Sequence, residues 1–406
     1  MRPPINKFLP ILISLVSLST LAACLWDYDT LAQERAKFPT ALELIAGKFP
    51  RHSPEFYQWR IDDRLAKLEQ GDDKPEYYDD LAVAYDKLKQ NDKAIEWMLL
   101  KKEKFNTDND VKYKTAANLG TFYLHSRQLD KGIEQLEKAI ELNPNAHFGR
   151  ERYQLYLARY LQLRIASRHL RMGKFALPLN YQVDEELDHE LPPREERISN
   201  FSEAVRQYNS PEDLYLKDED RSKAVQGILG MMRFGHYDSP VLLECLGDLL
   251  YDPGGGDNNA LTIAARAYLQ ASIHLDANNS AAQSGYLSLA KQSLHQKKDL
   301  KLHHIRRYLE QEVHEADQFY ASIVADEKRW IAEGLDVEAL FVAKYYTVES
   351  GEEDPFALND FSSKTPAPTR IPSASSLLTC VLVVLLSGSI VLYLIVRIVR
   401  RWRRKD

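Results

Sequence analysis

The 406-residue chain has a formal net charge of −6, 28% charged residues and three cysteines. Cys24 and Cys380 lie in apolar terminal segments, so Cys245 is the one cysteine of the body between them; this excludes a disulfide within the body and zinc sites of the cysteine type. Subtracting the two cations of residues 1–24 and the net +5 of residues 377–406 leaves the body at about −13. So acidic a surface argues against nucleic-acid binding and permits a basic partner.

Residues 1–24 have the features of a bacterial export signal. Arg2 and Lys7 give a positive start, an apolar run extends to Leu21, and small residues precede Cys24. The closing Leu-Ala-Ala-Cys sequence resembles a lipobox, which implies that Cys24 is acylated and becomes the new N-terminus. An ordinary cleaved signal and an uncleaved anchor are the alternatives. Leu21 favours the lipobox, because an A-x-A-like cleavage site would have a small residue there.

The body, residues 25–350, is predicted to be all-α. Apolar residues recur at helical spacing through most of it, and alternating β-branched patterns are nearly absent. A first helix is expected over residues 56–68. Pro75 is expected to begin the next helix, because proline is favoured at the first helical position.

Two adjacent segments, residues 75–108 and 112–145, share one pattern. Each follows the spacing W-x2-L-G-x2-Y in a first helix and has small and apolar residues at fixed positions in a second helix. The residues that carry the pattern are Tyr78, Leu81, Ala82, Tyr85 and Ala94 in the first segment, and Leu119, Gly120, Tyr123, Gly132, Leu136 and Pro144 in the second.

This pattern resembles the tetratricopeptide repeat (TPR). The resemblance implies TPR-like antiparallel helical hairpins stacked in a right-handed solenoid. Ala82 and Gly120 are equivalent small residues where the paired helices approach closely. They are 38 residues apart, against about 34 in the family, so an insertion is expected between the two copies.

The rest of the body is less regular. A weak match over residues 240–278 predicts a degenerate third hairpin. Residues 153–165 predict a long amphipathic helix, and the proline-rich, acidic residues 176–220 predict an irregular crossing. Residues 302–323 predict a second long helix, which we expect to pack back on the body rather than to form a coiled coil.

The C-terminal part predicts a membrane anchor. Residues 351–376 are rich in proline and serine and are typical of a flexible tether. Residues 377–399 form an apolar run long enough for one transmembrane helix. The basic tail, residues 400–406, is expected in the cytoplasm by the positive-inside rule. We therefore predict a single-pass protein of a bacterial cell membrane with an extracytoplasmic (periplasmic) body.

The resemblance also implies a concave groove lined by the first helix of each repeat. The candidate groove residues are Asp79, Val83, Asp86, Thr121 and His125. This acid-leaning lining predicts a peptide with basic residues as the partner. In some members of the family a lysine and an asparagine four residues apart on this helix bind a peptide carboxylate, and Lys114 and Asn118 match that pair. The alternative is a pair that simply faces solvent.

Motifs for catalysis are absent from the sequence. It has no His-Glu-x-x-His, nucleophile elbow, phosphate loop or dinucleotide fingerprint. The histidines in and near the late helix, at positions 295, 303, 304 and 314, form no i, i+4 pair, which favours solvated side chains. We therefore predict no catalytic residue, no metal site and no cofactor.

Together these features predict a membrane-tethered scaffold or adaptor for a protein or peptide partner in a bacterial envelope assembly, without a nucleic-acid partner. The oligomeric state is left open. One alternative is an envelope enzyme, or a subunit of one, with its site in residues 147–235. The other is a transmembrane signalling subunit, which would need a partner in the membrane because few residues follow the span.

Overall fold

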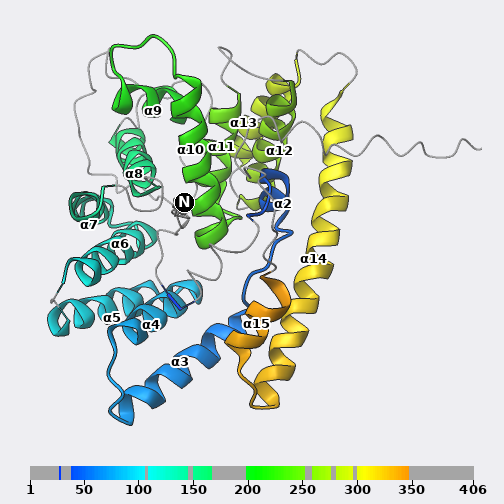
Figure 1. Cartoon of the computed structure of the whole chain (residues 1–406). Coiled ribbons are helices and arrows are strands. Elements are labelled where there is room, and N and C mark those ends of the chain that lie inside the picture. The colour runs from blue at the N-terminus through cyan, green and yellow to red at the C-terminus, as the bar shows by residue number, and fades with distance from the viewer. Residues whose placement is uncertain are drawn as a thin grey trace, which may run out of the picture. The chain divides into compact units, whose positions relative to one another are not determined.

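The computed structural model describes residues 27–28, 38–105, 108–144, 150–166, 198–251, 258–275, 280–295 and 300–346. The chain divides into two compact units, residues 1–362 and 363–406, and all described residues belong to the first. Their regular elements are helices without strands (Figure 1), which confirms the predicted all-α class. None of these helices has the length and apolarity of a membrane span. The predicted signal, Cys24, the tether, the span and the basic tail lie outside the described residues.

The body opens with two capped helices. Thr40 accepts a hydrogen bond from the Glu43 backbone N–H and begins α2 (Ala41–Ala46), with the Glu43 side chain completing a capping box. Ser53 caps α3 (Pro54–Glu69) in the same way, and Pro54 occupies its first turn. The helix expected over residues 56–68 is therefore present, and it begins two residues earlier.

Two helical hairpins follow at the expected repeats. The first consists of α4 (Pro75–Lys87) and α5 (Asn91–Lys104), and the second of α6 (Asn109–His125) and α7 (Leu129–Leu142). Both have the same turn: Lys89 and Arg127 have positive φ angles of 59° and 65°. In each turn the next backbone N–H donates to a carbonyl five residues back, at 2.8 Å. This is a Schellman ending with a non-glycine residue in the left-handed position, so the two hairpins are built alike.

Small residues allow the helices of the second hairpin to approach closely. A Cβ atom on Gly120 would lie 2.9 Å from the Leu136 side chain, and one on Gly132 would lie 2.5 Å from Leu124 and 3.2 Å from the Gly120 carbonyl oxygen. Most residues of the repeat pattern are interior. Tyr78, Leu81, Ala82, Tyr85, Ala94, Leu119, Gly120, Gly132 and Leu136 are buried, and Tyr123 is partly buried. Pro144 differs, because it lies exposed just after α7, where it contributes no core packing.

The remaining helices complete the body around a larger core. They are α8 (Arg150–Ala166), α9 (Phe201–Asn209), α10 (Asp218–Met231), the π-helical turn η3 (Met232–His236), α11 (Pro240–Leu250), α12 (Asn258–His274), α13 (Ser280–Ser293), α14 (Leu302–Ala332) and α15 (Val337–Tyr345). The expectation of an irregular crossing over residues 176–220 is wrong for α9, because Asn200 caps this helix and Phe201, Ala204 and Val205 bury its apolar face.

Helices α11 and α12 form a hairpin at the place of the weak third match. A Cβ atom on Gly247 would lie 2.6 Å from the Tyr268 ring, so glycine is the residue that permits this approach. Cys245 is buried beside it. The assignment of this hairpin as a degenerate repeat stays a prediction.

The long α14 packs back on the body, as predicted. Ile305, Leu309, Ala316, Ile323 and Trp330 form a stripe along it, and all five are buried. Near its end Glu327 is fully buried, accepts a hydrogen bond from the Ser53 backbone N–H at 2.8 Å and lies 2.6 Å from His52 Nδ1. Thus the start of α3 is tied to the last part of α14, 274 residues later in the sequence.

Candidate functional site

The first groove candidate, Asp79, is an interior group. Its carboxylate lies 2.5 Å from Lys101 Nζ and accepts a hydrogen bond from Asn118 Nδ2 at 3.1 Å. Asp79 is 5% exposed, and Lys101 and Asn118 are 1% and 0% exposed. Burial raises the pKa of Asp79 to about 6, against the opposing effect of the Lys101 ammonium group. These three residues join α4, α5 and α6 from within, so Asp79 does not line an open groove.

The next candidates, Val83 and Thr121, are also covered. Val83 is 2% exposed and Thr121 is 3% exposed. The Thr121 hydroxyl donates to the Ala117 carbonyl at 3.1 Å and accepts a hydrogen bond from Gln154 Nε2 at 3.1 Å. Because Gln154 belongs to α8, the inner side of the second repeat packs against another part of the same chain.

The expected carboxylate-binding pair is divided. Asn118 points into the interior network, whereas Lys114 is partly exposed and forms an ion pair with Asp110 at 2.7 Å, one turn earlier on α6. The Asn118 amide is bound to the buried Asp79 carboxylate, which also feels the charge of Lys114, so this pair is not open to the carboxylate of a peptide. The i, i+4 spacing placed them on one face, but helix packing covered only one of them.

The segment after α10 contacts the end of α4. Lys87 Nζ donates hydrogen bonds to the carbonyl oxygens of Phe234 at 2.5 Å and Gly235 at 2.8 Å. The π-helical turn has non-helical backbone angles at Gly235, which leaves these carbonyl oxygens available to Lys87. Burial lowers the pKa of Lys87. A side chain at the end of α4 thus holds the chain 147 positions later.

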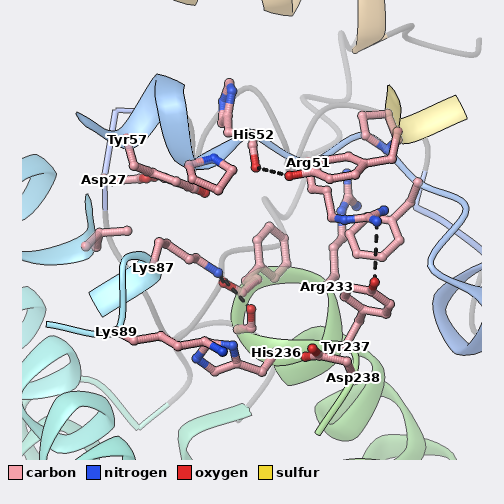
Figure 2. Close-up of a pocket in the computed structure, with 17 residues that line it drawn as sticks. Asp27, Arg51, His52, Tyr57, Lys87, Lys89, Arg233, His236, Tyr237 and Asp238 are labelled. Atoms are coloured by element: carbon pink, nitrogen blue, oxygen red, sulfur yellow. Dashed lines mark hydrogen bonds between the residues drawn. The ribbon is translucent and has the colours of Figure 1, made fainter. Parts of the chain in front are cut away.

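A cavity of about 280 Å³ lies beside this contact. It is bordered by residues from the range 49–57, by the end of α4, by η3 with the two residues after it, and by Tyr320 of α14. Figure 2 shows Lys87 and Lys89 on one side of it and Arg51 and Arg233 on the other. A volume at the small end of ligand sites can hold one small polar molecule or one side chain.

The cavity lining is cationic, but its arginines already have partners. Arg51 lies 3.9 Å from the ring centre of Tyr320 and 4.7 Å from that of Tyr237, and it donates to the Tyr237 hydroxyl at 3.3 Å. Arg233 lies over the Phe38 ring at 4.8 Å. These contacts hold the guanidinium groups against aromatic faces. The arginine side of the cavity wall is therefore fixed by packing within the protein.

Asp86, His125 and His236 meet next to the cavity. Asp86 is a buried residue in the last turn of α4, and His125 is the last residue of α6. His236 is the last residue of the π-helical turn and lines the cavity. Asp86 is 1% exposed, and its Oδ1 lies 2.7 Å from His125 Nδ1. The His125 and His236 rings are 4.8 Å apart in an edge-to-face arrangement. One potential ligand atom from each residue lies within 4.8 Å of the other two.

The electrostatics of this cluster follow from burial and proximity. Burial would raise the pKa of Asp86, but His125 holds it below its ordinary value. Burial, with smaller effects of His125 and Lys87, lowers the pKa of His236 to about 4. His236 was missed from the sequence because it lies far along the chain from Asp86 and His125. Only the packing of the turn onto the repeats brings the three together.

Comparison with known proteins bears on the hairpins that carry this cluster. The tetratricopeptide repeat family matches residues 113–146. The chain therefore contains a tetratricopeptide repeat. The match covers most of α6 and all of α7, and its bounds differ by one residue from those of the predicted second copy. No curated protein and no solved structure matches the chain.

Proposed function

We propose that this protein is a membrane-tethered, extracytoplasmic scaffold or adaptor of a bacterial envelope assembly and acts without catalysis. The observation that carries the proposal is the tetratricopeptide repeat at residues 113–146, because such repeats generally bind protein partners. The export-like residues 1–24 and the apolar residues 377–399 support the location.

The route to the partner differs from the sequence-based expectation. Asp79, Val83, Asp86 and Thr121 are buried. A partner therefore contacts the exposed surface of the repeats instead of these four residues. Leu99 and Leu100 on α5 are 45% and 43% exposed. The proposed basic character of the partner now depends on the net charge of about −13 over the body rather than on a defined acidic groove.

The first experiment tests the role of the repeats. The full-length protein, tagged within residues 351–376, is captured from crosslinked membranes beside the variant Leu99→Asp/Leu100→Asp. The control is Leu214→Asp/Tyr215→Asp, because Leu214 and Tyr215 are also exposed, at 86% and 72%, but lie between α9 and α10. A partner recovered with the native and control proteins and lost with the α5 variant supports the proposal. Equal recovery with all three makes the repeats structural.

A second experiment tests the location. Native protein should stay in the membrane fraction after an alkaline wash, and a chain truncated after residue 350 should show whether Cys24 alone retains it. Incorporation of labelled fatty acid that Cys24→Ser abolishes would establish the lipid. Release of the native protein by the alkaline wash would contradict the membrane anchor while leaving the repeat-based binding role intact.

A further inference from the structure

We propose that Asp86, His125 and His236 form a binding site for one divalent transition-metal ion of the zinc class. Two imidazoles and one carboxylate are a ligand set that Zn²⁺ accepts, with a fourth position left for water or an outside ligand. The site would be independent of the scaffold function, since it depends only on contacts within this chain.

The orphan oxygen of Asp86 points to a missing ligand. Asp86 Oδ1 contacts His125, but Asp86 Oδ2 is buried and has no hydrogen-bond partner in the described part of the chain. A buried carboxylate oxygen without a partner carries the full cost of its lost hydration. A metal ion bound at this oxygen would remove that cost.

The spacing of the three groups suits a single ion. A tetrahedral ion with bonds of about 2.1 Å holds its ligand atoms roughly 3.4 Å apart. Asp86 Oδ1 lies 2.7 Å from His125 Nδ1, which leaves Oδ2 of the same carboxylate for an ion, and one ligand atom from each residue lies within 4.8 Å of the other two. Side-chain adjustments of up to about 1.4 Å would therefore bring the ligand atoms to coordination distances.

The open coordination position would face the cavity. His236 is both a candidate ligand and part of the cavity lining, as Figure 2 shows. Val83 and Lys87, which flank Asp86 on α4, also line it. A water molecule or a carboxylate from outside could thus complete the coordination from the cavity side.

Lys87 is the main group opposing a cation. Its ammonium group is directed to the carbonyl oxygens of Phe234 and Gly235 and adds positive charge near the site. Asp27 and Asp238 act on Lys87 with the opposite sign, and Asp238 also acts on His236. Asp27 and Asp238 therefore counter part of the positive charge that Lys87 and the other cations of the cavity lining place near the site.

Coordination would give the fold a further connection. Asp86 is in the last turn of α4, His125 ends α6, and His236 ends the π-helical turn. One ion would link the first helices of both hairpins to the π-helical turn η3. Metal binding should therefore raise the stability of the repeat region, since the ion binds the folded state.

The test uses full-length protein that has been treated with a chelator and then dialysed. Zn²⁺ is titrated in competition with a chromophoric chelator, and Co²⁺ is added in a parallel sample for visible absorption. We expect one Zn²⁺ per chain, the absorption bands of four- or five-coordinate Co²⁺, and a higher Tm with zinc. Asp86→Asn and His236→Gln should each weaken zinc binding by at least about 100-fold, more than the loss of an outer-shell partner does.

The control removes a different pair of histidines. His303 and His304 have ring centroids 4.1 Å apart at the start of α14, which makes them an obvious competing surface site. His303→Ala/His304→Ala should keep the native zinc affinity. The proposal is overturned if the native chain binds no stoichiometric zinc, if Asp86→Asn and His236→Gln bind it as the native chain does, or if the control loses it. Circular dichroism shows which variants are folded. If a variant does not fold, the cobalt spectrum of the native chain still tests the proposal.

Discussion

Lys101 and Asp79 form an ion pair at 2.5 Å inside the first hairpin, with both side chains excluded from water. The pair connects α5 to α4, and Asn118 adds a hydrogen bond from α6. The sequence had suggested the opposite environment for Asp79. A buried pair is costly to break, because removal of one partner leaves an uncompensated charge.

Lys101→Met should therefore destabilise the protein strongly. We expect a loss of about 3–5 kcal/mol in the free energy of unfolding, measured by urea denaturation. Lys104→Met is the matched control, because Lys104 is on the same helix and its ion pair with Asp73 is at the surface. The control should change stability little. Similar effects of both variants would show that Asp79 reaches solvent.

Gly120→Ala should strain the second hairpin. The new methyl group would lie 2.9 Å from the buried Leu136 side chain and 3.3 Å from its backbone nitrogen. We expect a net loss of about 1–3 kcal/mol despite the better helix propensity of alanine. In a double-mutant cycle, Leu136→Ala should cost less in the Gly120→Ala background, because the clash is gone. Strictly additive effects would contradict the close approach.

Glu151 should make stability pH-dependent. Burial raises its pKa to about 7, although Tyr113 donates a hydrogen bond to it at 2.5 Å. Because the folded-state pKa is above the ordinary value of 4.5, the folded protein binds the proton more tightly. The resulting stability is fully present at low pH and is lost as pH rises through about 7.

Glu151→Gln should remove this contribution. Between pH 5 and pH 8, the free energy of unfolding of the native protein should fall by roughly 2 kcal/mol more than that of the variant. Urea titrations at several pH values measure the difference. Asp79 and Asp248 also have raised pKa values and add their own pH dependence to both proteins. The difference in unfolding free energy between native protein and variant therefore isolates Glu151. Parallel pH profiles would exclude a buried, protonated Glu151.

Glu327→Gln should loosen the contact between α14 and α3. The carboxylate serves both His52 and the Ser53 backbone N–H, and an amide cannot accept both hydrogen bonds equally. We expect faster hydrogen exchange in α14 and at the start of α3. Glu315→Gln is the control, since Glu315 lies on the same helix in an exposed pair with Lys48. If exchange rises equally in both variants, Glu327 has no special role in holding α14.

Much of the helical architecture could be read from local patterns. Pro75 stands at the helix start it predicted, and the apolar stripe of α14 is visible as residues three and four apart. The spacing around Gly120 predicted a repeat close to the bounds that the family comparison gives. Such patterns involve residues within one or two helical turns of each other, so they can be recognised without knowledge of the tertiary fold.

The sequence by itself determined the all-α class, the repeat and the small residues between paired helices, although it missed α9. Only the tertiary structure decided which face of the repeats is open. Gln154 of α8 covers Thr121, and residues 234–235 accept hydrogen bonds from Lys87. Likewise His236 reaches Asp86 across 150 residues. The physical reason is that a helical period gives the face on which a side chain lies, whereas its burial depends on which distant segment packs there.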